Sequence, residues 1–174
     1  LKPTNQRMVV TKADSTRRVV RELNAEPAAR EYARLLGKDP NRLSPFTFAA
    51  HPLMVRVGGE HHVRAIQRVT ADDELVFFSA IDAGLVLSLS EPEDLVVHLE
   101  RSLTSLAAHR RPDAILACDC ILRRLEAEQK QISRRVSAIL SAHRAIGFST
   151  YGEQFRAMHV NQTMTGVAFY RPDA

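Results

Sequence analysis

The chain has 174 residues, 45% of them hydrophobic and 25% charged, with a formal net charge of +4. This composition is typical of a globular domain, and because no segment approaches about 18 uninterrupted apolar residues, it excludes a transmembrane helix. The basic residues are scattered and aromatic residues make up only 6%, which argues against a nucleic-acid interface that stacks bases. Two cysteines cannot build a disulfide framework, so a reducing, cytoplasmic compartment is expected.

The first half of the chain has the pattern of short strands with one early helix. Strands are predicted at 7–12 and 16–23, joined by a turn. The helix that follows is predicted to be capped by Asn24 and to end at Gly37. Further strands are predicted at 53–57, 60–69, 74–80 and 85–89. Paired glycines, Gly58-Gly59, join the first two of these in a hairpin, so this region is predicted to be an antiparallel meander.

The second half mixes helices with strands. Ser90 and Glu93 have the spacing of a capping box, and a helix with a leucine stripe is predicted after them. The remaining predicted elements are a strand at 114–120, a long helix at 121–143, and two last strands at 145–151 and 163–170. Strands in blocks favour the α+β class. We therefore expect a mostly antiparallel sheet with a strand meander, two long helices in the C-terminal half and a final β-hairpin.

Cys118-Asp119-Cys120 is the first stretch that could carry chemistry. The two cysteines could be soft metal ligands or a reactive thiol, but their apolar neighbours favour a buried structural role. No second ligand pair lies at the short spacing of a zinc site. Asp119 is expected on the opposite face of the strand from the cysteines, near its end.

The histidines leave two further possibilities open. His62 and Arg64 are predicted to share one strand face, where they could hold an anionic group or form an ordinary solvated hairpin surface. Haem also stays open as a cofactor, because one histidine can serve as its axial ligand and the chain has seven.

The densest polar signal lies near the end of the chain. Gly147–Glu153 is followed by His159, Asn161 and Thr163. If the two last strands pair, Glu153 and His159 flank one connection and could form a pocket that reads an amine and a carboxylate. The alternative is a plain hairpin in which glycines allow close packing and threonines favour strand. No nucleophile elbow, zinc-protease helix or phosphate loop is present, so nothing indicates an enzyme.

Four stretches together resemble the C-terminal region of the FIST family of sensory domains. They are Val9-Val10-Thr11 through Val20–Asn24 to Pro27-Ala28 and Tyr32; Pro52-Leu53 with Val63-Arg64; Cys118-Asp119-Cys120 followed by Arg123; and Gly147–Glu153 with His159, Asn161, Thr163 and Thr165. The resemblance implies one FIST C-terminal-like domain over residues 1–174, a fragment without the family's N-terminal half. It also implies a non-enzymatic role in signal transduction, with an amino-acid-like small molecule as ligand.

The resemblance implies a signalling partner, while the ligand-binding residues are inferred from the density of polar side chains in the matching stretches. The candidates are Arg64, Asp119, Arg123, Tyr151, Glu153, His159, Asn161 and Thr163, with no catalytic residue and no metal ligand. In the hypothesis, Glu153 holds a cationic group of the ligand, Arg64 holds an anionic group, and Asn161 with Thr163 fixes the orientation. The partner is expected to be a signalling protein such as a histidine kinase or a cyclic-di-GMP enzyme.

Three alternatives to this hypothesis remain. One subgroup of the family resembles haem proteins that sense nitric oxide, and any of the seven histidines could be the axial ligand. A cysteine- or metal-dependent enzyme would use Cys118 or Cys120 as nucleophile and His159 as base. A pure interaction module would dock its partner on the helix at 121–143.

Overall fold

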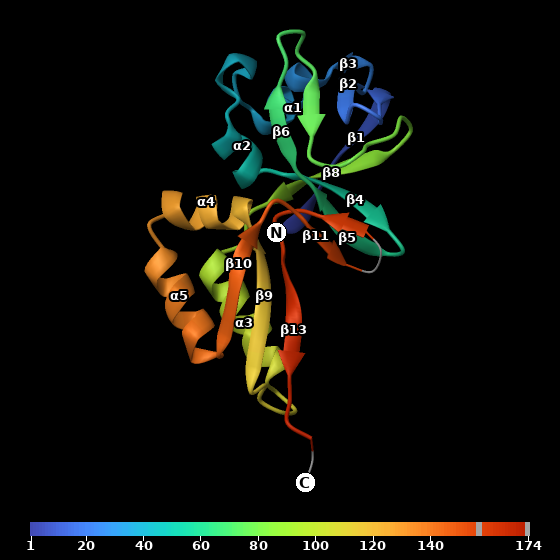
Figure 1. The fold of residues 1–174 in the computed structure, drawn as a ribbon. Coiled ribbons are helices and arrows are strands. Elements are labelled where there is room, and N and C mark those ends of the chain that lie inside the picture. The colour runs from blue at the N-terminus through green and yellow to red at the C-terminus, as the bar shows by residue number, and fades with distance from the viewer. Residues whose placement is uncertain (156–157, 173–174) are drawn as a thin grey trace. The chain divides into compact units, whose positions relative to one another are not determined.

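The computed structural model describes residues 1–155 and 158–172, which form two compact units, Leu1–Pro92 and Glu93–Ala174. Helices and strands are mixed as the α+β class requires, so the predicted fold class is confirmed (Figure 1). None of the helices in the described part of the chain is both long enough and apolar enough to cross a membrane. Each unit has its own core and is described by itself.

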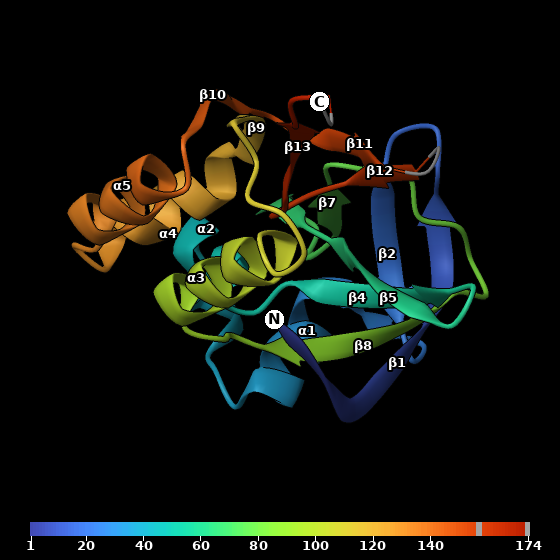
Figure 2. The same cartoon turned by 90° about the horizontal axis from the view of Figure 1, so that it is seen from below.

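The first unit is built around one antiparallel sheet. Its elements are β1 (Lys2–Asp14), β2 (Val19–Leu23), β3 (Glu26–Pro27), α1 (Ala28–Leu36), η1 (Pro40–Arg42), α2 (Pro45–Ala50), β4 (Leu53–Val57), β5 (Glu60–Arg64), β6 (Ile66–Val69), β7 (Leu75–Phe77) and β8 (Val86–Glu91). The strand order is β5-β4-β8-β1-β2-β7-β6, with β3 paired to β2. β5 and β6 lie at opposite ends of this order, yet only Ala65 separates them in the chain, so the sheet must curl (Figure 2).

The core of this unit comes from alternate residues of the strands and one face of α1. Its largest fully buried members include Met8, Leu23, Tyr32, Leu53, Phe77 and Leu87. The predicted strands of this region are confirmed, although the strand predicted over 60–69 divides at Ala65. The Gly-Gly hairpin is also confirmed, since Gly58 and Gly59 have φ values of 58° and 88°, in the left-handed region that such turns require.

The predicted cap of α1 is wrong, while its predicted end is confirmed. Asn24 does not cap the helix, because it lies at a φ of 53° and its Oδ1 accepts instead from the backbone N–H of Val9, 2.9 Å away. The residue before the helix is Pro27, which provides no side-chain cap. Gly37 ends the helix in the left-handed conformation, with a φ of 65°.

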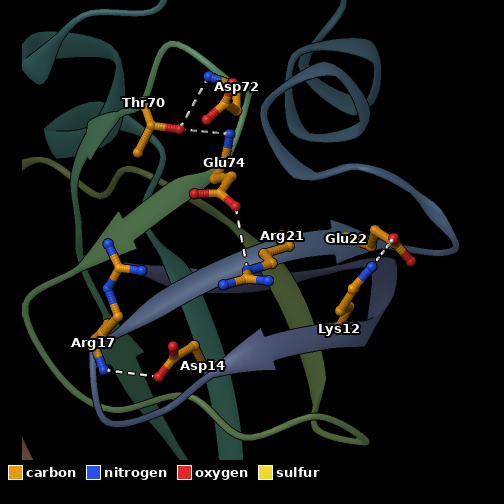
Figure 3. Close-up of polar contacts among 8 residues, drawn as sticks. All are labelled: Lys12, Asp14, Arg17, Arg21, Glu22, Thr70, Asp72 and Glu74. Carbon is orange, nitrogen blue, oxygen red and sulfur yellow. Dashed lines mark hydrogen bonds and ion pairs between the residues drawn. The ribbon is translucent and has the colours of Figure 1, made fainter.

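Polar contacts between neighbouring strands lie at the surface of this unit (Figure 3). Lys12 of β1 pairs with Glu22 of β2 at 3.3 Å, and Arg21 of β2 pairs with Glu74 at 3.3 Å. The Thr70 hydroxyl accepts from two backbone N–H groups of the turn before β7. Exposed ion pairs contribute at most about 1 kcal/mol each, so these contacts help to fix register more than stability.

One carboxylate of this unit is buried, and protein groups neutralise it. Glu31 of α1 is only 3% exposed. It accepts from Arg34 Nε at 2.6 Å and Nη2 at 2.8 Å, and from Asn24 Nδ2 at 2.8 Å. The hydrogen bond from Arg34 is the largest cause that holds the pKa of Glu31 below its ordinary value, against the opposing effect of burial.

The second unit contains a three-stranded sheet, three helices and a small hairpin. Its elements are α3 (Leu95–Leu106), β9 (Ala114–Cys120), α4 (Ile121–Gln129), α5 (Ser133–Ala142), β10 (Ala145–Thr150), β11 (Glu153–Phe155), β12 (Met158–Val160) and β13 (Met164–Phe169). The sheet order is β10-β9-β13, with β10 parallel and β13 antiparallel to β9. A core of Val96, Leu99, Leu103, Ile115 and Ile139 joins α3 and α5 to the sheet.

Two predictions about the helices of this unit are wrong. The cap of α3 is Asp94, whose Oδ1 accepts from two backbone N–H groups at 2.9 Å each, whereas Ser90 belongs to β8. The helix predicted over 121–143 divides into α4 and α5. Gln131 has a φ of 56°, and Ile132 N–H donates to Ala127 O at 2.9 Å, a bond that closes α4. The break lets Ile132 pack against the core of the unit.

The last strands form, but they do not pair with each other. β10 and β13 both pair with β9 and lie on either side of it. The connection between them holds the final hairpin, β11 with β12, in which Glu153 is opposite Val160. The polar residues predicted to flank one connection therefore lie in and beside this short hairpin.

Candidate functional site

The candidate site lies where β9 and β10 end and α4 begins. The parallel register places Ser149 beside Asp119 and Thr150 beside Cys120. Cys120 is also the residue that precedes the first turn of α4. The carboxyl ends of parallel strands, next to a helix N-terminus, are a common place for ligands in sheets with this connection. The sequence from β10 into β11 brings Glu153 to this edge.

Five residues around the hairpin form what we call the hairpin cluster: Thr150, Glu153, His159, Asn161 and Thr163. Glu153 is 4% exposed, and its Oε2 accepts from Thr163 Oγ1 at 2.5 Å. Its Oε1 accepts from the hydroxyl of Thr150. The carboxylate therefore ties the end of β10 to the residue just before β13.

The charge of Glu153 has no cationic partner in the described part of the chain. Two neutral hydroxyls are its hydrogen-bond donors there. A buried carboxylate costs several kcal/mol to desolvate, and hydroxyl donors offset only part of this cost. Glu153 is thus a buried anion that would gain from a nearby positive charge.

Asn161 is the second unusual member of the hairpin cluster. It is fully buried, and its Nδ2 lies 3.0 Å from His159 Nε2. Its Oδ1 is buried without a hydrogen-bond partner among the described residues. Gly152 makes room for this arrangement, because a Cβ there would lie 2.6 Å from His159 Nε2 and 3.0 Å from Asn161 Nδ2. Buried amide oxygens are normally paired, so Asn161 presents a free acceptor.

Cys120 lies near the hairpin cluster, and its buried thiol is expected to be unreactive. It is 1% exposed, and burial is the largest cause that raises the pKa of its thiol. The carboxylates of Glu153 and Asp119 raise it further, while backbone N–H groups oppose them. A thiol in this setting stays protonated and is a poor nucleophile. Cys118 is half-buried, and the described residues hold no group of three or more His, Cys, Asp or Glu side chains that could bind a metal.

Asp119 and Arg123 form an ion pair with each other. Arg123 Nε donates to Asp119 Oδ1 at 2.6 Å, across the junction of β9 and the first turn of α4. Burial is the largest cause that raises the pKa of Asp119, and the Arg123 charge opposes it. The pair braces the strand end against the helix.

The structure brings some of the predicted ligand residues together and separates others. Glu153, His159, Asn161 and Thr163 gather around the hairpin, whereas the side chain of Tyr151 is 81% exposed. Arg64 belongs to the first unit. It is opposite Leu53 in the β4–β5 hairpin, and burial lowers its pKa. His62, opposite Val55, shares its face as predicted. The anionic grip itself stays a prediction.

Thr150 is the member of the hairpin cluster that the sequence did not single out as a binding residue. Its hydroxyl reaches the carboxylate of Glu153 three residues later. A threonine three residues before a glutamate has the spacing of a capping box, in which the two side chains bond to backbone N–H groups at the start of a helix. That spacing was the available signal, but here it closes a strand end.

Comparison with protein families gives one result. The family model of the FIST C domain matches residues 28–156, a range that crosses both units and covers most of the chain. The match confirms the resemblance inferred from the sequence and ends before His159, Asn161 and Thr163. Searches of curated proteins and of solved structures find no match.

Proposed function

The chain belongs to the FIST C domain family of sensory domains in signal-transduction proteins, and from this premise we propose that it senses a small molecule carrying an ammonium group at the hairpin cluster. The observation that supports the proposal is a set of buried hydrogen-bond acceptors that no cationic side chain neutralises in the part of the chain that the structure describes. Glu153 is 4% exposed and is held only by hydroxyls among the described residues. An amino-acid-like metabolite would supply the positive charge.

The chemistry of Asn161 favours the same class of ligand. A free Oδ1 requires a hydrogen-bond donor, and an ammonium group has three. A carboxylate or phosphate ligand would meet two acceptors and no complementary charge at this place.

Signalling requires that the ligand binds two states of the protein with different affinity. The two threonine hydroxyls connect Glu153 to the end of β10 and to the start of β13. An ammonium group that bonds to Glu153 would either displace the hydrogen bonds from these hydroxyls or strengthen them. In either case it would change how firmly the β11–β12 hairpin is held to the sheet, and a partner protein could read that change.

The proposal leaves out four of the earlier candidates, of which Tyr151 is 81% exposed and lies outside the hairpin cluster. Arg64 belongs to the first unit, so its predicted grip on an anionic group is a separate question. Asp119 and Arg123 neutralise each other and need no ligand. Haem and the identity of a kinase or cyclic-di-GMP partner stay predictions, and a Soret band after haem reconstitution would test the first.

The test is a thermal-shift screen of the purified chain with matched small molecules. Ligands that bind the folded state raise the melting temperature by mass action. Simple primary amines and amino acids should raise it, whereas carboxylic acids without an amine should not. The shift should disappear in Glu153→Gln, which removes the charge but keeps the size of the side chain.

Glu31→Gln is the matched control, because Glu31 is equally buried and carries its own cationic partner. This variant should keep the full shift. The proposal fails if no amine stabilises the chain, or if Glu153→Gln responds to amines as strongly as Glu31→Gln does.

A further inference from the structure

Five large apolar side chains are exposed on one face of the three-stranded sheet of the second unit. They are Leu116 (42% exposed), Ile146 (73%), Phe148 (61%), Val167 (56%) and Phe169 (51%), and we call them the outer sheet face. The strand registers place them side by side. Ile146 and Val167 are both opposite Leu116, so these three form one row across β10, β9 and β13. Because side chains alternate along a strand, Phe148 and Phe169 lie on the same face.

The opposite face of this sheet is covered within the unit. Ile115, Ala145, Met164 and Ala168 pack there against residues of α3 and α5. In Figure 1, α3 passes behind β9, and none of the helices described in this unit crosses in front of the three strands. This mixed sheet is therefore covered on one face, while the other face exposes large apolar side chains to solvent. Clustered exposed apolar side chains of this kind usually mark an interaction surface.

The composition of the outer sheet face limits what can cover it. The residues on it, including Cys118 and Thr165 in the neighbouring row, are all uncharged. A charged partner surface would lose its hydration there without gaining an ion pair. A second copy of the same face brings no charge into the contact. In a two-fold dimer the same patch of each subunit packs against the other, so an uncharged apolar patch can serve as both halves of the interface.

The area of the face fits a modest dimer. Summed over the five side chains, the exposed fractions correspond to roughly 500 Å² per copy, or roughly 1,000 Å² for a pair, at the lower end of specific protein interfaces. An exposed apolar patch of several hundred Å² usually marks an interaction site. We propose that the chain forms a reversible homodimer in which two outer sheet faces pack against each other.

The experiment is sedimentation velocity over a series of protein concentrations, with the whole chain and with two variants. Ile146→Lys places a charge at the centre of the proposed contact, where it would face the same charge in the second copy. Val97→Lys is the matched control, because Val97 is similarly exposed at 59% but lies on α3. Circular dichroism checks that both variants are folded.

The chain should sediment as a monomer–dimer equilibrium. The association constant of the dimer should fall by roughly tenfold or more in Ile146→Lys and should not change in Val97→Lys. Val167→Lys, in the same row as Ile146 but on β13, should reproduce the effect. If the chain is a monomer at every concentration, the proposal is overturned. The face would then be covered by another part of the chain or by a different protein. A dimer that survives both β-strand variants overturns it as well.

Discussion

Each unit buries one glutamate almost completely, and the two are neutralised in different ways. Glu31 is 3% exposed and receives two bonds from Arg34 and one from Asn24. Glu153 is 4% exposed and receives bonds from two threonine hydroxyls. The desolvation cost of the charge is thus met inside the protein in the first unit. In the second it is met only in part, which makes Glu153 the carboxylate suited to an external cation.

The largest effect is expected from removing both donors to Glu153. Thr150→Val with Thr163→Val keeps the side-chain shapes and leaves the buried carboxylate without its hydroxyl partners. Because hydrogen bonds to charged groups are worth about 1.5–3 kcal/mol each, the free energy of unfolding should fall by about 3 kcal/mol or more, measured by denaturant titration. Thr165→Val on β13 is the control and should cost little. An equal loss in the control would contradict the role given to the two hydroxyls.

A somewhat smaller loss of stability is expected from Gly152→Ala. Comparison with a glycine elsewhere in the chain distinguishes the steric clash at the hairpin cluster from ordinary backbone strain. A Cβ at Gly152 would meet the His159 ring, whereas a Cβ at Gly84, in the first unit, would meet nothing within 4 Å. Gly84 has a φ of 89°, so Gly84→Ala reports backbone strain alone, about 1 kcal/mol. Gly152→Ala should cost about 2 kcal/mol, because it also displaces His159 from Asn161. Equal costs in the two variants would mean that His159 moves freely.

The sequence predicted features that depend on local chemistry. The end of α1 followed from Gly37, whose residue type matches the left-handed conformation it adopts. The division of the long helix was missed because Gln131 takes the same conformation without being glycine or asparagine, and only tertiary packing of Ile132 explains it. The bond from Thr163 to Glu153 spans ten residues and depends on how β9 separates β10 from β13, which periodicity does not reveal.

The same amide substitution should have opposite signs at the two buried glutamates. Glu31→Gln removes the ion pair with Arg34, and since Arg34 is largely solvated the loss should be about 1 kcal/mol. Glu153→Gln removes a buried charge that has no cationic partner among the described residues, and its amide can still accept from one threonine and donate to the other. Without ligand, this variant should be as stable as the parent chain or more stable, measured by denaturant titration. A loss in Glu153→Gln as large as in Glu31→Gln would show that both carboxylates are structural.

The smallest effect is a difference in pH dependence between two carboxylates, one from each unit. The folded pKa of Glu31 lies below its ordinary 4.5, chiefly because of Arg34, so its contribution to stability is full above pH 4.5 and is lost as the pH falls through the folded value. The folded pKa of Asp119 lies above its ordinary 3.8, chiefly because of burial, so its contribution is full below pH 3.8 and is lost as the pH rises through the folded value. Unfolding free energies measured from pH 3 upward should therefore show Glu31→Gln approaching the parent chain as the pH falls, and Asp119→Asn gaining stability relative to the parent chain as the pH rises. Parallel curves for Asp119→Asn and the parent chain would mean that Arg123 fully offsets the burial of Asp119, and the second unit would then neutralise this carboxylate as completely as the first unit neutralises Glu31.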